Sequence, residues 1–493
     1  MTPLDLTLFL AYLLGIAGFS YWLHRRRHTT DVFLAGRAMG WFPIGLSVMI
    51  TLFSAVNFVA FPTEVMEYGL YVLASLPVFV LVAIPITRVF IPFFHGMKLT
   101  SLYAYLEVRF DRRTRLLGAG LFILWRLFWM ATALYASARM LGAITGISFH
   151  LLILAAGGVA ALYTAMGGIR TVMWTDVIQF VVLLVGIGGA LWVAGATQEQ
   201  GWTGVWAQAR VGGQLRPFLP FDPEFLSWRP TVRITLWSAL IGTFVAFLTR
   251  YGADQMVVQR YFTARSLGAA VRGFWWNVFA ALTALLLLVF LGLAIAAASA
   301  GSPAPAMARF GAFAKTLPFG LTGILAAGLL AATMSSIDSG LNACMASWMT
   351  DFEKQPPEAA VDWRQESRYR RFVFLLTVVT ILLAYVVGRT GDLFSVVNRV
   401  INGMGSPLLA LLLLGMFSRS CNARGAWIGG IIGTLASLAI SFGLDGLALH
   451  YYAVANLLVT CAACWTISAA TKTNDPVTEE QRTWTWYARR HAE

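Results

Sequence analysis

Residues 277–297 read NVFAALTALLLLVFLGLAIAA, a largely apolar stretch with no charged side chain. A helix of about 20 residues is long enough to cross a hydrocarbon core of roughly 30 Å. Comparable stretches recur along the whole chain, and their residues do not alternate between apolar and polar as the strands of a membrane β-barrel do. The pattern predicts an all-α polytopic membrane protein.

The composition agrees with this prediction and excludes a large water-exposed surface. Of the 493 residues, 58% are hydrophobic and 12% are charged, whereas soluble domains carry about a quarter charged residues. The net charge of +13 lies in short clusters between apolar stretches, which does not fit the extended basic face of a nucleic-acid-binding protein. Cys461 and Cys464 have metal-ligand spacing but no other ligands nearby in the sequence, so we expect no metal or redox site there. The expected partner is the lipid bilayer, and not nucleic acid.

We expect about thirteen transmembrane helices in a single transmembrane domain, residues 1–493, because no loop is large enough to hold a core of its own. The apolar stretches place these helices at 4–24, 39–62, 70–95, 116–145, 148–166, 171–197, 231–252, 272–300, 319–349, 371–388, 391–417, 424–444 and 447–470. The polar segment at about 471–493 is expected to be a short tail.

The loops alternate in charge, which predicts the orientation of the chain. One side of the membrane receives five basic clusters, at 24–27, 109–115, 260–272, 364–371 and 419–424. The other side receives Glu64, Glu67 and the long loop at about 198–230. Because basic loops stay in the cytoplasm, we expect a multi-pass protein of the cytoplasmic membrane, with the N-terminus outside and the C-terminal tail inside.

Polar residues inside the expected spans are the informative exceptions, because burial in hydrocarbon costs several kcal/mol unless they find partners. Ser335, Asp338 and Ser339 lie within one helical turn in the middle of a long span, and Asp176 lies inside another. Hydroxyl and carboxylate oxygens suit a small hard cation. The hydroxyls alone could instead bond to their own helix, and Asp176 alone could be a charge near a helix N-terminus. Two intramembrane carboxylates together favour a cation pathway.

Two further features leave alternatives open. Thr51, Ser54 and Asn57 recur along one apolar stretch, either as a packing seam or as the unwound middle of a broken helix whose carbonyls face a cavity. Arg126 either snorkels toward the cytoplasmic face or meets an anionic group of a substrate. Arg250 and Asp254, near a cytoplasmic helix end, are more consistent with a gate or an ion pair than with ligands.

Several motifs share an order and spacing along residues 32–434. They are TSLYAYLEVRF at 100–110, YTAMGG at 163–168 leading into WTD at 174–176, DQ at 254–255 with VQR at 258–260, MSSIDS at 334–339 with LN at 341–342, and GMF at 415–417 through GA at 425–426. With these motifs the chain resembles the sodium:solute symporter family, which includes sodium-coupled sugar, sialic acid, proline and monocarboxylate carriers. The resemblance implies ten core helices in two inverted five-helix repeats, at about 39–197 and 231–417, with extra helices at both ends.

The resemblance also implies site residues. A first sodium ion would be held by Ile50, Phe53, Ala332, Ser335 and Ser336. A second ion, present in some members, would map to Asp176, Ser335, Asp338 and Ser339, although Asp338 stands where several relatives have a hydroxyl. The substrate contacts would map to Ser54, Asn57, Trp129, Tyr251 and Asn398. The arginine that grips a carboxylate in sialic acid carriers aligns with Trp129, and Arg126 lies one turn away, so we add Arg126 to the candidate substrate contacts.

The expected function is sodium-coupled symport of a small organic solute by alternating access, with sodium as the coupling ion and no cofactor. A proton-coupled transporter stays open, because protons could also use the two carboxylates. A membrane solute sensor is the other alternative, although the tail at 471–493 is too short for a signalling domain. We expect no enzyme, since no span combines a nucleophile with a base or a set of metal ligands.

Overall fold

The computed structural model describes residues 1–25, 33–97, 99–165, 168–198, 200–318, 320–353, 363–388, 393–444, 446–448, 450–473 and 475–490. These residues form helices joined by loops, and no strand occurs among them. The expected all-α membrane fold is therefore confirmed.

Among the described residues, ten helices are long and apolar enough to cross a membrane, and one bent pair adds an eleventh. The ten are α1 (Pro3–Arg25), the run η2 to α5 (Leu70–Gly96), α7 (Arg112–Thr145), α9 (Ile169–Ala196), α13 (Leu267–Ala298), α15 with η6 (Leu321–Phe352), α16 (Trp363–Val387), α17 (Leu393–Phe417), α18 (Ala423–Gly443) and α19 (Tyr451–Thr471). The bent pair is α2 (Trp41–Leu52) and α3 (Ala55–Tyr68). The shorter helices α8 (Phe149–Thr164) and α11 (Thr243–Gly252) occupy the other two expected spans, so the total of thirteen stays a prediction.

The remaining short helices lie in the connections. They are η1 (Ala35–Arg37), α6 (Ala104–Arg109), α10 (Gly201–Val211), η4 (Pro223–Leu226), η5 (Ser238–Gly242), α12 (Gln255–Phe262), α14 (Ala306–Lys315), α20 (Glu479–Thr483) and α21 (Trp486–Arg490).

Two helices of the core are interrupted, and capping residues explain where each resumes. Between α2 and α3 the helix axis bends by 63°. Phe53 is extended there, and the Oγ of Ser54 caps α3 by accepting the N–H of Val56 at 3.1 Å. Asp254 caps α12 in the same way after α11, accepting the N–H of Met256 at 3.0 Å. A residue that caps a new helix ends the old one, which leaves the last carbonyls of α2 without helical partners.

Helix α15 is the centre of the molecule. Every residue from Leu325 to Ser347 is buried, and the helix packs against α9, α7, α2 and α1. Its polar side chains therefore contact other helices and not solvent. The seam between α2 and α15 is the first place to look for a site.

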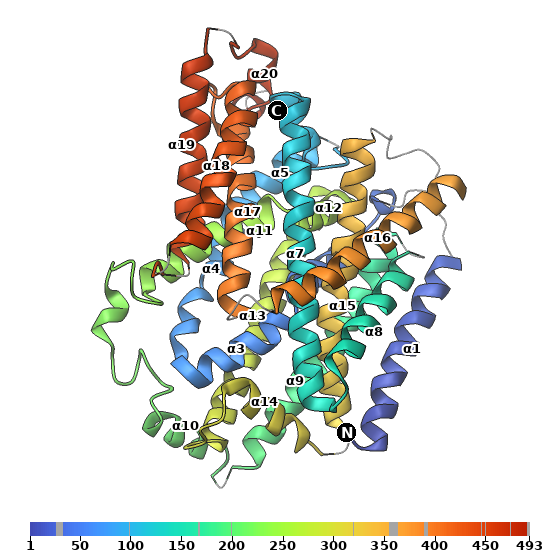
Figure 1. The fold of residues 1–493 in the computed structure, drawn as a ribbon, viewed down its shortest axis with the longest axis vertical. Coiled ribbons are helices and arrows are strands. Elements are labelled where there is room, and N and C mark those ends of the chain that lie inside the picture. Colours follow the sequence, from blue (N-terminus) through green and yellow to red (C-terminus); the bar gives the residue numbers. More distant parts are fainter. Residues whose placement is uncertain are drawn as a thin grey trace.

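The two ends of the molecule hold different segments of the chain. Figure 1 places the start of α1, α10 and α14 at one end of the long axis and α20 at the other. Near α20, the buried Arg109 donates to the carbonyls of Gly415 (3.1 Å) and Ser418 (2.5 Å), and Gln481 donates to the carbonyl of Phe110. The basic segments 109–115 and 419–424 thus lie together with the C-terminal helices. Arg26 and Arg27, of the first expected basic cluster, lie outside the described residues.

Helices α18 and α19 touch through a stripe of glycines. A Cβ added to Gly429 would lie 2.5 Å from the Cα of Cys464, and one added to Gly433 would lie 2.7 Å from the Cα of Thr460. Small residues four apart let membrane helices approach backbone to backbone. This pair forms a closely packed edge beside the core.

Candidate functional site

The end of α2 meets the middle of α15 in a set of oxygen atoms that we call the α2–α15 cluster. It comprises the carbonyls of Ile50, Thr51 and Ala332 and the hydroxyls of Ser335 and Ser336. Ser335 donates to the Ile50 carbonyl at 2.8 Å and lies 3.2 Å from the Ala332 carbonyl. Ser336 donates to the Thr51 carbonyl at 3.1 Å.

The chemistry of the α2–α15 cluster suits a small cation. Ile50, Ser335 and Ser336 have no exposed surface, so an ion here would be surrounded by protein oxygens. The carbonyls at the C-terminus of α2, which have no partner within their own helix, carry the negative end of its macrodipole. Four of the residues expected at the first sodium site meet here, and Phe53 adjoins them at the break.

A second buried set joins four helices, and we call it the Asp176–Arg260 cluster. It comprises Ser47 and Thr51 of α2, Asp176 of α9, Arg260 of α12 and Ser339 of α15. The guanidinium of Arg260 donates from Nε to Ser47 Oγ at 2.6 Å and from Nη2 to Thr51 Oγ1 at 2.7 Å. The same Nη2 lies 2.5 Å from Ser339 Oγ and 3.2 Å from Asp176 Oδ2.

The Asp176–Arg260 cluster differs from the second ion site that the family resemblance implied. Asp176 and Ser339 come together as expected, but Ser335 belongs to the α2–α15 cluster. Asp338 turns its Oδ1 to the N–H of Ser339, 2.5 Å away. Arg260, one of the basic residues expected on the cytoplasmic side, is fully buried between the expected ligands. The sequence could have indicated this contact, because a carboxylate inside a membrane span, such as Asp176, requires a positively charged or hydrogen-bonding partner.

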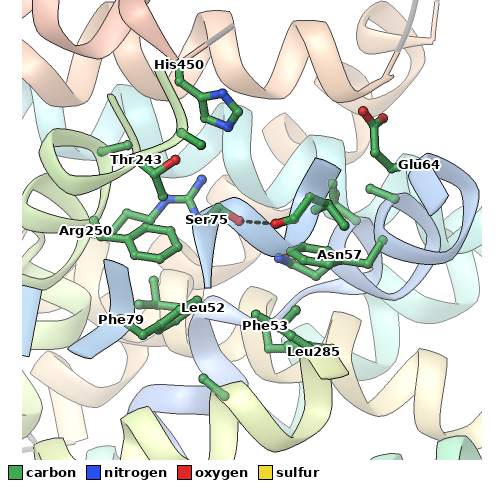
Figure 2. Close-up of a pocket in the computed structure, with 18 of the residues that line it drawn as sticks. Leu52, Phe53, Asn57, Glu64, Ser75, Phe79, Thr243, Arg250, Leu285 and His450 are labelled. Atoms are coloured by element: carbon green, nitrogen blue, oxygen red, sulfur yellow. Dashed lines mark hydrogen bonds between the residues drawn. The ribbon is translucent and has the colours of Figure 1, made fainter. Parts of the chain in front are cut away.

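A cavity of about 110 Å³ is lined in part by residues of the α2–α3 break (Figure 2). Phe53 and Asn57 from the break, Trp129 from α7 and Tyr251 from α11 line it. Asn57, Trp129 and Tyr251 were expected substrate contacts, and the structure places all three here.

Two other expected substrate contacts, Ser54 and Arg126, are not among the described residues that line the cavity. Ser54 caps α3. Arg126 is almost fully buried and forms an ion pair with the buried Asp254, so its guanidinium is held at the start of α12. The assignment of Arg126 as a substrate contact stays a prediction, and in the structure its partner is the carboxylate of Asp254. The side chain of Asn398 lies outside the described residues.

Arg250 is a cationic residue that lines the cavity, although its position in the sequence favoured a gate or an ion pair. Figure 2 shows its guanidinium pointing into the cavity between Thr243 and Ser75. It lies 5.8 Å from the ring centre of Trp129, and no salt-bridge partner for it occurs among the residues that the structure describes. The Nε1 of Trp129 and the Oγ1 of Thr243 also have no hydrogen-bond partner within that part of the chain. The cavity therefore presents hydrogen-bond donors near Arg250, and its lining also includes the carboxylate of Glu64, which pairs with Arg233, and the amide of Asn57.

Comparisons with known proteins identify the family. Residues 32–433 match the sodium:solute symporter family. The sodium-dependent multivitamin transporter of Oryctolagus cuniculus is 31% identical over 429 residues, which cover 84% of this chain and 65% of that transporter. Sodium-coupled monocarboxylate transporter 1 of Mus musculus is 29% identical over 427 residues, covering 84% of this chain and 68% of that protein. The chain thus spans about two thirds of the length of these relatives.

The solved structures agree at the level of the fold. A Na+-coupled sialic acid symporter in a substrate-bound outward-open state superposes with a TM-score of 0.85 at 24% identity, covering 95% of this chain and 98% of that one. Mhp1, a nucleobase-cation-symport-1 family transporter, superposes with a TM-score of 0.60 at 14% identity, covering 92% of this chain and 97% of that one. The match across most of its length, the shared fold and the motifs around the two buried clusters lead to one conclusion: this chain belongs to the sodium:solute symporter family.

Proposed function

We propose that this protein is a sodium-coupled symporter that carries a small organic anion across the cytoplasmic membrane by alternating access. The observation that carries the proposal is the position of Phe53. This residue follows the carbonyls of Ile50 and Thr51 that meet α15, and it also lines the cavity. One helix break therefore belongs to both the α2–α15 cluster and the cavity.

Sodium would bind in the α2–α15 cluster. Its proposed ligands are the oxygen atoms of Ile50, Phe53, Ala332, Ser335 and Ser336. In the structure the two hydroxyls donate to the carbonyls, and with an ion bound they would turn their lone pairs toward it. The ion would then order the break and shape the cavity. A coupling free energy of this kind is reciprocal, so bound solute would also raise the affinity for sodium.

The donors in the cavity favour a carboxylate solute. A guanidinium pairs with a carboxylate through two parallel hydrogen bonds, and Arg250 faces a largely apolar wall where such a pair is little screened by water. The cavity of about 110 Å³ favours a small molecule. The relatives named above as monocarboxylate and multivitamin transporters are consistent with this choice.

The orientation and the domain organisation form part of the proposal. We infer that the end with segment 109–115 and α20 faces the cytoplasm and that the start of α1 lies outside. The chain would act as one domain whose repeats, about 39–197 and 231–417, rock around the central break. The breaks at Phe53 and Asp254 fall early in each of these segments, as inverted repeats would require.

The test is uptake of a radiolabelled panel into proteoliposomes: lactate, pyruvate, nicotinate, glucose, sialic acid and proline. We expect a small monocarboxylate to accumulate when sodium is present outside, and not when choline replaces it. Accumulation driven by an inward proton gradient in choline medium would establish the proton-coupled alternative instead. A neutral solute as the best substrate would overturn the anion assignment.

Arg250→Gln tests the anion contact. Loss of a charged hydrogen bond to the solute costs about 1.5–3 kcal/mol, which corresponds to roughly a ten- to hundredfold higher half-saturating solute concentration. Arg272→Gln removes the same charge from an exposed position on α13 and should leave uptake unchanged. Equal behaviour of the two variants would exclude Arg250 as the carboxylate contact.

A further inference from the structure

We propose that His450 selects among carboxylate solutes by binding an oxygen on the carbon next to the carboxylate, so that the transporter prefers 2-oxo and 2-hydroxy monocarboxylates over unsubstituted acids of the same length. The inference rests on the proposed function, because it concerns the solute that the same cavity binds. His450 immediately precedes α19 and lies beyond residues 32–433, the part of the chain that matches the family. This selectivity would therefore come from the terminal helices and not from the two repeats.

The connection between α18 and α19 packs closely against the helical segment that leads into α11. Ala448 donates its N–H to the carbonyl of Pro230 at 2.6 Å. A Cβ added to Gly242, the last residue of η5, would lie 2.2 Å from the carbonyl oxygen of His450 and 2.6 Å from its Cβ. The missing side chain of Gly242 therefore lets His450 approach the helix that carries Arg250.

His450 lines the same cavity as Arg250. Figure 2 shows its imidazole on the same side of the cavity as Thr243 and the guanidinium of Arg250. The Nδ1 of His450 is buried and has no hydrogen-bond partner among the described residues. Because buried polar atoms are nearly always hydrogen-bonded, this nitrogen is available to a ligand.

Several other polar side chains of the lining already have partners within the protein. These are Asn57, Glu64, Ser75 and Tyr71. The Nε1 of Trp129 and the Oγ1 of Thr243 lack a partner in the described part of the chain, as His450 Nδ1 does. An indole can only donate, so His450 and Thr243 are the two candidates that can either donate or accept. The experiment below separates them.

A guanidinium beside an imidazole matches a carboxylate that has an oxygen on the next carbon. Arg250 would hold the carboxylate through two parallel hydrogen bonds. A neutral imidazole has one N–H donor and one acceptor nitrogen, so His450 can donate to a 2-oxo group or accept from a 2-hydroxyl group. A solute without that oxygen would leave a buried polar atom unpaired, and this lowers its affinity.

The experiment compares pyruvate, lactate and propionate, which differ only at the second carbon, in sodium-driven uptake into proteoliposomes that hold the full chain. In the wild type we expect half-saturating concentrations of pyruvate and lactate about three- to tenfold below that of propionate, the range of one hydrogen bond. His450→Phe keeps a ring without a hydrogen-bonding nitrogen. In this variant the three acids should agree within about twofold, near the wild-type value for propionate. His450→Gln keeps a donor and an acceptor and should restore part of the preference.

Two further variants separate selectivity from a structural role. His150→Ala removes an imidazole from an exposed position on α8 and should leave all three concentrations unchanged. Arg250→Gln should raise all three together, because each acid has a carboxylate. If His450→Phe does not fold, His450→Ala takes its place in the same comparison.

Three results would overturn the inference. They are equal half-saturating concentrations of the three acids in the wild type, an equal rise for all three in His450→Phe, and a preference that is lost in Thr243→Val but kept in His450→Phe. Uptake of another carboxylate of the panel without pyruvate or lactate would also overturn it, while leaving the proposed function intact. A wild type that accumulates no carboxylate in sodium would refute the proposed function itself, so the two failures are distinguishable.

Discussion

Replacing Ser336 with alanine removes one oxygen from the α2–α15 cluster and little else. The hydroxyl lies 3.1 Å from the carbonyl of Thr51 and is fully buried, so no water molecule from bulk solvent replaces it at once. The change is one atom in size, which leaves the packing of α15 against α2 nearly intact. The variant therefore separates a contact to the ion from a contact between helices.

The magnitude follows from what the hydroxyl contacts in each state. Without sodium it makes a hydrogen bond between neutral groups, worth about 1 kcal/mol. With sodium it would contact a charge, and contacts of that kind are worth about 1.5–3 kcal/mol. The net loss of sodium binding is the difference between these two values, about 0.5–2 kcal/mol. Since each 1.4 kcal/mol is about tenfold in an equilibrium constant, we expect a roughly two- to thirtyfold higher half-saturating sodium concentration.

Two assays measure the effect independently. Uptake into proteoliposomes at increasing external sodium gives the half-saturating concentration directly. Thermal unfolding of the purified protein at increasing sodium, with choline holding the ionic strength, gives the same constant, because an ion that binds only the folded state raises the melting temperature. Both curves should shift together, and maximal uptake at saturating sodium should stay near that of the wild type.

The matched control is Thr333→Val, on the same buried helix. Thr333 donates to the carbonyl of Leu329, 2.9 Å away in its own helix, so removing its hydroxyl touches no residue of the cluster. Sodium dependence should not change in this variant. A shift of less than about twofold in Ser336→Ala, or equal shifts in both variants, would refute the reasoning, because effects that small fall below a single contact to a charge.

Two further predictions concern the scaffold. Arg126→Gln or Asp254→Asn alone leaves a buried charge without its partner, so each should lower stability by about 3–5 kcal/mol, and the double variant should recover part of this loss. Thermal unfolding measures the loss of stability, and the exposed Arg229→Gln is a control that should behave like the wild type. Single variants as stable as that control would exclude the Arg126–Asp254 pair as a determinant of stability. Gly429→Val forces α18 away from Cys464 of α19 and should lower stability by about 1–3 kcal/mol, whereas Gly443→Val, with open space around its Cα, should be tolerated. Equal melting temperatures for these two variants would contradict the close approach of α18 and α19.

The sequence alone determined the class of the protein and the position of its polar exceptions. Hydrophobicity is a property of each segment by itself, so the spans could be predicted before any packing was known. The same holds for Ser335, Ser336 and Asp176, because a hydroxyl or carboxylate inside an apolar helix must find a partner wherever that helix lies. The structure buries all three completely.

The tertiary structure alone decided which partner each group found. Thr51 offers its carbonyl to Ser336 and its hydroxyl to Ser339, because the end of α2 crosses α15 at that point. Ser335 and Ser339 therefore belong to different clusters, although they lie one turn apart on the same helix. Spacing along one helix says which residues share a face, and it does not say what crosses that face.

Arg126, Arg250 and Arg260 show most clearly that a sequence does not specify the partner of a buried polar group. The sequence places Arg126, Arg250 and Arg260 toward the cytoplasmic ends of their segments, yet one pairs with Asp254, one faces the cavity and one fills the cluster around Asp176. The chain changes direction where Asp254 caps α12, so Arg250 and Arg260, on either side of that break, point to different sites. A long side chain goes to the nearest opposite charge that the fold brings within reach, and that distance exists only once the helices have packed.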